Sequence, residues 1–520
     1  MRKILVSGLV LLFTFYPFSL TGDSSQELEV KKVPEGQGHS DITKADIQPL
    51  ILSLTDVVEL ALKNNLGIAV ERYSPRISEL EIVKAEAEFD PEFAAEVSGG
   101  GTTSPGFSTW AGETALTARR DKEINLEAGL SKKFSTGATG SVLLYTRRLQ
   151  TNRSGIFLNP SWSSDLTFSL TQPLLKDFGR KINEAEILIA RNNESISLNE
   201  FHSRVLEVVA GAEELYWDLV FAYEDLEVKE RSLALAKDLL EKNTKRVEAG
   251  VLAPIETLRP QAELAAREEG VVIARSRIRD LVDELKNILN LNPISASQEA
   301  TIRPADAALY EAVEVDLDSS TKEALENRPD YAQAKKDLEN LDISLVVAKN
   351  ATLPQLDLAA TYNVNGLGGN LGNDVDMLAT PDFFDWEVGL NFAIPLGNRK
   401  AKSEYLQAKW EKEKAILGLK SLENDIVTEV KAAVREVGTN LRRIETNRRA
   451  RELAEELLKA EEKRFELGLG SSLDVLEAQK DVTSAQSAEL EAIIDYNISL
   501  VRLAETEGTL VAQSGVIIQE

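Results

Sequence analysis

Few residues in this sequence have the types and spacing that chemistry at a site requires. The 520 residues include no cysteine and only two histidines, His39 and His202. A chain without cysteine has no disulfides, thiolate metal sites, cysteine nucleophiles or lipid-modified N-terminal cysteine. His202 has no second histidine at helical spacing, so we interpret it as a packed or solvated side chain. The sequence therefore predicts neither a bound metal nor a cofactor.

Two other patterns resemble sites but fit plainer explanations. Glu213-Glu214 and Glu461-Glu462 could form general acid–base pairs, yet on long helices such pairs are better explained as solvated faces or as the lining of an internal space. Gly366-Leu-Gly368-Gly369-Asn-Leu-Gly372 nearly matches a dinucleotide-binding fingerprint. It follows a predicted strand but opens no predicted helix, and its third glycine is out of register, so we predict a loop. Without a nucleophile–base or metal constellation, we do not expect an enzyme.

The composition is that of a folded and strongly acidic protein. Hydrophobic residues make up 43% of the chain and charged residues 28%, which are proportions typical of folded rather than disordered proteins. There are 59 Lys and Arg against 85 Asp and Glu, a formal net charge of −26. Nucleic-acid binding requires a basic face that neutralises phosphates, so this balance argues against a nucleic-acid partner.

The N-terminus has the order of regions found in secretory signal peptides. Two basic residues precede an apolar run from Ile4 to Phe18, and small or polar residues follow up to Gly22. We predict a signal peptide at 1–22, whose removal changes the net charge from −26 to −28. An uncleaved anchor is the alternative, although the run is short for a span of about 20 residues. No later stretch has the roughly 18 consecutive apolar residues of a spanning helix, so re-entry into a membrane requires a β-barrel.

The chain repeats its own pattern in order and in spacing. Leu54-Thr55 and Ala61-Leu62-Lys63-Asn64 return 263 residues later as Leu317-Asp318 and Ala324-Leu325-Glu326-Asn327, and Pro91 returns as Pro354. Lys245-Arg246-x-Glu248-x-Gly250 returns 218 residues later as Lys463-Arg464-x-Glu466-x-Gly468, so the first half carries a longer insert. We predict an internal duplication with these parts: a flexible segment at 23–53, repeats at 54–290 and 317–508, a connector at 291–316 and a tail at 509–520.

Each half reads as helix, β segment, long helix, turn and long helix. The predicted helix from Arg180 to Ala249 has apolar residues at alternating steps of four and three, the period of a left-handed coiled coil. These residues are Phe201, Val205, Val208, Ala212, Leu215, Leu219, Ala222 and Leu226. A second apolar line through Val209 and Tyr216 predicts neighbours on two sides. Taken alone, this helix also fits an ordinary soluble coiled coil.

Alternation of apolar and polar residues predicts six strands in two β segments, 91–175 and 354–396. The first segment holds four strands, at about 92–99, 124–134, 138–149 and 164–172, and the second holds two. We expect exposed loops at 100–123, 150–163 and 364–385. Aromatic residues gather at strand ends, as they do at the girdles of membrane barrels. A small soluble sheet would show the same alternation, and the signal peptide favours the barrel.

In this combination the residues resemble the TolC-type outer-membrane efflux and export channels. The resemblance covers about 54–508 and rests on the duplication, on the prolines that bound each β segment and on the two turn sequences. Pro91 and Pro354 open the segments, and Gln172-Pro173-Leu174-Leu175 and Ile394-Pro395-Leu396 close them. The family has two strands per half, whereas this sequence has four and then two. We therefore predict six strands per copy and eighteen in a trimer, rather than twelve.

The resemblance implies both a fold and a function. The implied fold is mainly α with a transmembrane β-barrel: a long antiparallel coiled-coil tunnel joined to a barrel that three copies share in outer-membrane lipid. The helical part would lie in the periplasm of a Gram-negative-type cell and meet a periplasmic adaptor joined to an inner-membrane pump. The function would be a passive exit duct for tripartite efflux or type I secretion. The alternative is a periplasmic coiled-coil structural or adaptor protein without a barrel.

The resemblance places the adaptor contacts at the two hairpin tips. The tip residues are Arg246, Gly250, Val251, Leu252, Arg464, Gly468 and Leu469. Glycine permits the positive φ that closes a helix, and Pro254 suits the start of a returning helix. The apolar tip residues are not explained by turning alone, because exposed turns favour polar side chains. Four prolines mark the barrel-to-helix transitions: Pro91, Pro173, Pro354 and Pro395.

Overall fold

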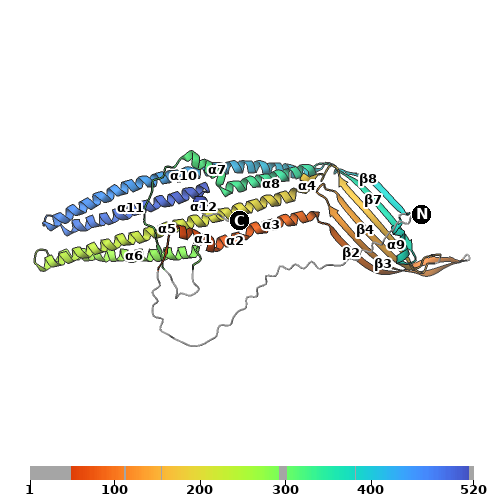
Figure 1. Ribbon diagram of the computed structural model, residues 1–520, viewed down its shortest axis with the longest axis horizontal. Coiled ribbons are helices and arrows are strands. Elements are labelled where there is room, and N and C mark those ends of the chain that lie inside the picture. Colours follow the sequence, from red (N-terminus) through yellow and green to blue (C-terminus); the bar gives the residue numbers. More distant parts are fainter. Residues whose placement is uncertain (1–48, 111–112, 154, 292–300, 381, 514–520) are drawn as a thin grey trace, which may run out of the picture. The chain divides into compact units, whose positions relative to one another are not determined.

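The computed structural model describes residues 49–110, 113–153, 155–291, 301–380 and 382–513 (Figure 1). The predicted signal peptide and most of the predicted segment 23–53 lie outside the described residues. None of the helices in the described ranges combines the length and apolar character that a bilayer span requires. The described residues belong to one compact unit of long helices and a sheet.

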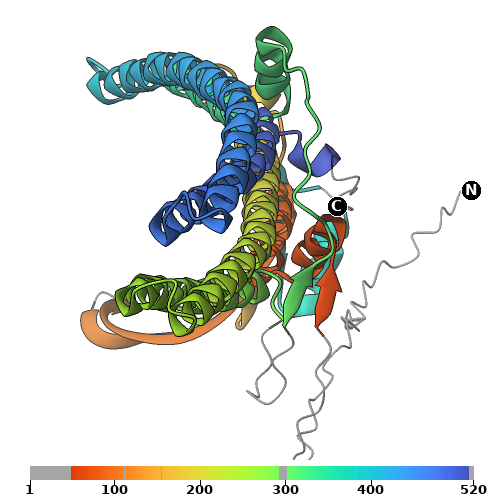
Figure 2. The ribbon, with the colours of Figure 1, turned by 90° about the vertical axis from the view of Figure 1, so that its left-hand side faces the viewer.

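Four long helices form two antiparallel hairpins. The first hairpin consists of α5 (Ala185–Glu248) and α6 (Leu258–Ile288), and the second of α10 (Arg399–Glu466) and α11 (Ser472–Glu507). The helices contact one another in the lateral order α6, α5, α11, α10. Seen end-on in Figure 2, they follow an open arc. Within the described residues, α6 and α10 thus each have only one of the four long helices as a lateral neighbour.

Nearer the sheet, two further helices join this layer of helices. The helix α3 (Tyr73–Glu86) packs on α5, and α8 (Pro329–Ala351) packs between α5 and α10, in the order α3, α5, α8, α10. The remaining helices are short: α1 (Leu54–Asn64), α2 (Leu66–Glu71), α4 (Arg180–Asn183), α7 (Leu317–Asn327), α9 (Leu371–Ala379), α12 (Leu510–Gln513), and the 3-10 turns η1 (Ala87–Phe89) and η2 (Pro254–Thr257).

Six antiparallel strands form one sheet at the end of the helices opposite the hairpin tips (Figure 1). The strands are β2 (Glu92–Trp110), β3 (Glu113–Lys133), β4 (Thr139–Thr151), β5 (Ser161–Pro173), β7 (Gln355–Gly368) and β8 (Phe384–Ala393). They pair in the order β2-β3-β4-β5-β7-β8, so the β5–β7 ladder joins the two halves of the chain. The predicted count of four strands followed by two is confirmed.

Several local predictions were wrong. The predicted loop 100–123 is mostly strand, because the β2–β3 ladder continues to the pair Trp110 and Glu113. Backbone pairing continues there although the apolar alternation has ended. The predicted loop 364–385 contains the end of β7 and the helix α9. This helix begins directly after Asn370, whose side-chain oxygen caps it by accepting a hydrogen bond from the Asn373 N–H. Residues 50–52, predicted as part of a flexible segment, form β1 (Leu50–Leu52), which pairs in parallel with β6 (Ile302–Pro304) of the connector.

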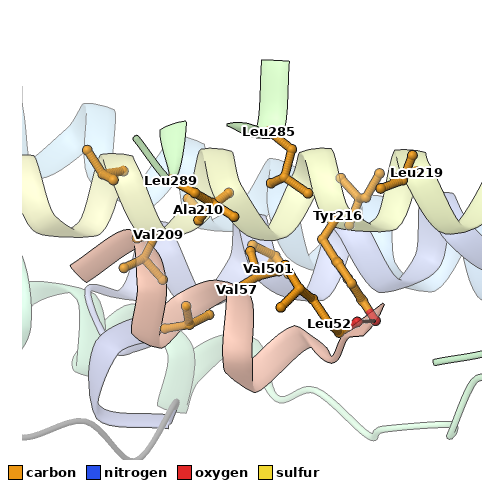
Figure 3. Packing of buried hydrophobic residues seen from close by; sticks show 14 of the residues in the cluster. Leu52, Val57, Val209, Ala210, Tyr216, Leu219, Leu285, Leu289 and Val501 are labelled. Carbon is orange, nitrogen blue, oxygen red and sulfur yellow. Dashed lines mark hydrogen bonds between the residues drawn. The ribbon is translucent and has the colours of Figure 1, made fainter. Parts of the chain in front are cut away.

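Both predicted apolar lines of the first long helix are buried. Val205 and Ala212 lie on one line, Val209 and Tyr216 lie on the other, and all four are nearly inaccessible to solvent. Figure 3 shows how α5 packs here between residues of α1, α6 and α11. The Tyr216 hydroxyl lies 2.5 Å from an Asp306 carboxylate oxygen. Burial and this carboxylate raise the pKa of Tyr216, so its hydroxyl remains a donor.

Candidate functional site: hairpin tips, open edges and sheet faces

The two hairpin tips have the same backbone geometry. Gly250 and Gly468 both have φ of 74°. At the first tip the Val251 N–H bonds the Arg246 carbonyl at 2.9 Å, and the Gly250 N–H bonds the Val247 carbonyl at 2.9 Å. The second tip repeats both bonds, from Leu469 to Arg464 at 2.8 Å and from Gly468 to Phe465 at 3.1 Å. This is the Schellman motif, in which a glycine in the left-handed region ends a helix.

The returning helices begin differently. Pro254 starts the 3-10 turn η2 that leads into α6, and its fixed φ suits the first turn of a helix. At the start of α11, Ser471 and Asp474 form a reciprocal capping box. The Ser471 backbone N–H and then its hydroxyl lower the pKa of Asp474, so this cap is complete above the carboxyl's ordinary pKa. Each tip is therefore held on both sides by local bonds.

The apolar side chains of the tips point into solvent. Val251 is 71% exposed and Leu469 is 70% exposed, while Leu252 is half-buried. The glycines leave open space as well, because nothing lies within 4 Å of a Cβ built on either Gly250 or Gly468. Two apolar side chains thus stand at the tips with no cover from the described part of the chain. This is the surface that the sequence predicted for a partner.

Both tip arginines make contacts with other residues of the chain. The Arg246 guanidinium lies over the Phe465 ring, 4.4 Å from its centroid, and donates to the Phe465 carbonyl at 3.2 Å. Arg246 therefore joins the first tip to the second. Arg464 pairs with Glu461 at 2.7 Å along its own helix. These contacts make both arginines structural elements of the tips, whereas Val251 and Leu469 are the free surface.

The four predicted transition prolines lie at the ends of strands. Pro91 and Pro354 directly precede β2 and β7, Pro173 is the last residue of β5, and Pro395 follows β8. Where the chain leaves β5, the Leu174 N–H bonds the Leu356 carbonyl at 2.7 Å. Such bonds tie the exit of the first β segment to the entry of the second. The junction between sheet and helices is thus shared by both halves of the chain.

The two faces of the sheet differ sharply in polarity. One row of directly opposed residues crosses all six strands: Phe93, Leu130, Val142, Phe168, Tyr362 and Trp386. Directly opposed residues share a face, so this face is apolar on every strand. The other face is rich in acids, which include Glu96, Glu123, Glu127, Asp165, Asp357, Asp385 and Glu387. Such a sheet separates an apolar surface from a polar one.

The edges of the layer expose apolar residues. On α2 and α3, side chains spaced three or four residues apart are exposed to solvent: Leu66, Val70, Tyr73, Ile77, Leu80 and Val83. At the opposite edge, Leu406, Trp410 and Leu417 form a similar line on α10. The edge strands β2 and β8 likewise pair on one side only. A helix normally buries such a line against a neighbour.

The solvated faces predicted for the acidic pairs are only partly observed, because Glu213 is buried and the Glu461 side chain is 14% exposed. His202 lies in α5 with its ring 6.1 Å from that of Phe201. Glu214 pairs with Arg502 at 2.6 Å. Among the described residues, no three His, Cys, Asp or Glu side chains cluster as metal ligands would. Sequence reasoning missed Asp374 of α9, a fully buried carboxylate that accepts bonds from the Ser164 N–H at 3.1 Å and hydroxyl at 2.5 Å.

Comparison with known proteins agrees with this geometry. Residues 321–509 match the family Outer membrane efflux protein. The resemblance to the TolC-type channels is confirmed. Outer membrane protein TolC of Vibrio cholerae is 24% identical over 301 residues, which span 57% of this chain and 67% of that protein. Pyoverdine export outer membrane protein OpmQ of Pseudomonas aeruginosa is 23% identical, over 62% of this chain and 65% of its own length.

Solved structures show the same fold over nearly the whole chain. The outer-membrane channel OprN superimposes with a TM-score of 0.64 at 15% identity, covering 92% of this chain and 99% of OprN. The CmeC outer membrane channel of Campylobacter jejuni gives 0.62 at 17% identity, covering 92% of this chain and 94% of CmeC. The chain therefore has the fold of the TolC-type channels. The sequence relatives match it over about two thirds of their own length or less.

Proposed function

We propose that three copies of this chain form a passive exit duct through the outer membrane. The duct would serve tripartite efflux or type I secretion, with its tips facing a periplasmic adaptor that is joined to an inner-membrane pump. The main support is the pair of open edges, because a curved layer with one apolar line on α3 and another on α10 is incomplete alone. The edges differ in sequence, so the contact joins α3 of one copy to α10 of the next.

The two sheet faces support a membrane position for the strands. In a shared barrel the apolar face would meet lipid and the acidic face would line a water-filled lumen. Three sheets of six strands give eighteen, within the range of porins whose lumens hold water. Heat-modifiable migration and recovery in the outer-membrane fraction test this arrangement. The alternative, a periplasmic coiled-coil protein without a barrel, predicts neither.

The absence of cysteine makes the edge contact easy to test. A chain with both Ile77→Cys and Trp410→Cys should give covalent dimers and trimers with a short bismaleimide. Chains with either change alone should remain monomeric on denaturing gels, since each interface would then hold a single thiol. Mixing the two single variants should produce dimers only. Cross-linking of a single variant to itself would show a symmetric interface and contradict the proposed head-to-tail ring.

The tips are tested separately from assembly. Val251→Asp or Leu469→Asp places a charge on a side chain that is already about 70% exposed, so folding and trimer formation should be unaffected. Cross-linking to the adaptor and transport should be abolished if apolar contact holds the adaptor. Thr244→Asp is a matched control, because Thr244 is exposed on α5 before the tip. Transport at the wild-type rate by both tip variants would show that the tips only reverse the chain and do not hold the adaptor.

We also infer that the two halves arose by duplication, with repeats at 54–290 and 317–508. Two pairs of matching elements support this. The helices α1 and α7 both have 11 residues and end at a residue with φ of −64° and ψ of 123°. The tips at Gly250 and Gly468 share their hydrogen bonds. In three copies the duplication would place six similar tips in one ring, which suits contact with a ring of adaptor hairpins.

A further inference from the structure

Three basic residues lie on the apolar face of the sheet, at its end away from the helices. Arg148 of β4 directly opposes Ile124 of β3 and Trp162 of β5, which places it on the apolar face. Lys122 and Arg120 follow at two-residue steps from Ile124 and share that face. Arg120 and Lys122 are exposed and Arg148 is half-buried. Lys122 is the diagonal neighbour of Arg148, about 7 Å away, and Arg120 lies one further two-residue step, also about 7 Å, along β3. We call this row of three charges the basic cluster.

The basic cluster differs from the arginines of the opposite face. There, Arg147 pairs with Glu123 at 2.6 Å, and Arg119 pairs with Asp121 at 2.9 Å. In the described part of the chain, none of Arg120, Lys122 and Arg148 has an acidic partner within 4 Å. Unpaired basic side chains beside an apolar surface are suited to an anion from outside the chain.

The surface next to the basic cluster is open. On β2, the residues opposite Ile124 and Lys122 are Gly99 and Gly101, which present no side chain to this face. A Cβ built on either glycine would meet no atom nearer than 3.8 Å. On the other side, the Arg148 guanidinium lies 6.0 Å from the Trp162 ring centroid. Glycine in a strand leaves space for close approach, and tryptophan is typical of the lipid–water interface.

The position of the basic cluster matches the rim of a membrane. The next basic residue along the same face of β3 is Lys132, ten residues from Lys122, and the residues between them on this face are Ile124, Leu126, Ala128 and Leu130. At about 3.4 Å per residue and a tilt of about 40°, ten residues rise roughly 26 Å. Outer-membrane barrels have an apolar band about 25 Å tall. Lys122 and Lys132 would thus lie at its two borders.

We propose that the basic cluster of Arg120, Lys122 and Arg148 binds the anionic phosphate of a lipid head group in the leaflet nearest the strand-connecting loops. This inference rests on the proposed function, which places the apolar face in lipid. Charge complementarity selects the head group, and the apolar rows directly below would hold the acyl chains. Because β3 and β4 are internal strands of the sheet, a second copy pairing at β2 or β8 would not cover the basic cluster, and α9 packs on this face at β5 and β7 instead.

Lipid binding can be measured on the full-length assembly in nanodiscs. The discs would be made of phosphatidylcholine, with or without a diphosphorylated lipid A, and bound lipid would be counted by native mass spectrometry after transfer to neutral detergent. The triple variant Arg120→Ala, Lys122→Ala, Arg148→Ala should retain lipid A about a hundredfold more weakly, because each basic residue at a membrane surface contributes roughly fivefold. Lys132→Ala, on the same face at the opposite border, is the matched control and should bind as wild type does.

Each alternative outcome has a distinct meaning. Equal retention by the triple variant and the wild type would overturn the inference. Competition by millimolar inorganic phosphate would also overturn it, since the site would then recognise a free anion rather than a lipid. The same preparations should be tested for trimer formation and conductance. If the wild type forms no conducting trimer, the proposed function itself fails. If it conducts but does not prefer lipid A over phosphatidylcholine, only the lipid site fails.

Discussion

The contact between Arg246 and Phe465 predicts that one side chain couples the two hairpin tips. The Arg246→Ala change removes a guanidinium that lies 4.4 Å from the Phe465 ring centroid and donates to the Phe465 carbonyl at 3.2 Å. A half-exposed cation–π contact contributes about 1 kcal/mol, and a hydrogen bond from a charged donor about 1.5 kcal/mol at the low end. After allowance for solvent, the tip should lose about 2 kcal/mol, which is roughly a thirtyfold increase in local opening.

Amide hydrogen exchange measures this loss directly. In Arg246→Ala, exchange of the amides at 243–258 and 461–476 should quicken about thirtyfold, while that of the sheet stays unchanged. Arg464→Ala is the matched control, because the Arg464 side chain is 54% exposed and its only ion pair among the described residues, with Glu461, lies within one helix and does not reach the other tip. Such pairs contribute about 0.5 kcal/mol, so exchange should quicken about twofold. Equal effects of the two variants, or an effect of Arg246→Ala confined to the first tip, would refute the coupling.

Three further predictions follow from other contacts. Gly468→Ala should destabilise the protein by about 1 kcal/mol, because alanine is strained at the positive φ of this position. Gly418→Ala should stabilise the helix α10 by a similar amount, because alanine has the higher helix propensity. Thermal unfolding of both variants checks the two signs. Asp374→Asn should free α9 from Ser164 and expose 369–384 to protease, unlike Asp376→Asn at an exposed position. Bilayer recordings should show a preference for cations that weakens as the salt concentration rises. The double variant Asp385→Asn, Glu387→Gln should weaken this preference as well. An anion-selective pore would show that these acids do not line the lumen.

Patterns with a short period in the sequence predicted most of the fold. Heptad steps identified both buried lines of α5, and the repeated glycines identified the ends of α5 and α10. These features depend on neighbours within one or two turns of the chain, which a sequence displays directly. Alternation likewise identified all six strands, because each strand has one apolar face. The recurrence of similar motifs in the two halves of the sequence allowed the two hairpins to be recognised together.

Features that depend on distant residues were missed. The helix α9 follows a run of glycine and asparagine that locally favours a loop, and its Asp374 bonds Ser164, which is 210 residues away in the chain. The extension of the β2–β3 hairpin begins with Gly100 and Gly101, where backbone pairing continues without side-chain alternation. The partner of Arg246 lies 219 residues away in the chain. Local composition contains no signal for any of these contacts.

The strand count and the two unlike faces of the sheet together favour assembly of several copies. A six-stranded sheet has too few strands to close on itself, since small barrels need about eight, and its edges β2 and β8 are unpaired with each other. Its acids therefore enclose a lumen only when further copies extend the sheet. A head-to-tail contact between unlike edges must either close into a ring or continue as a filament. If the apolar face meets lipid, as we propose, it favours the ring, because only closure shields every strand edge. Native mass spectrometry in detergent should therefore show closed trimers and no ladder of larger species.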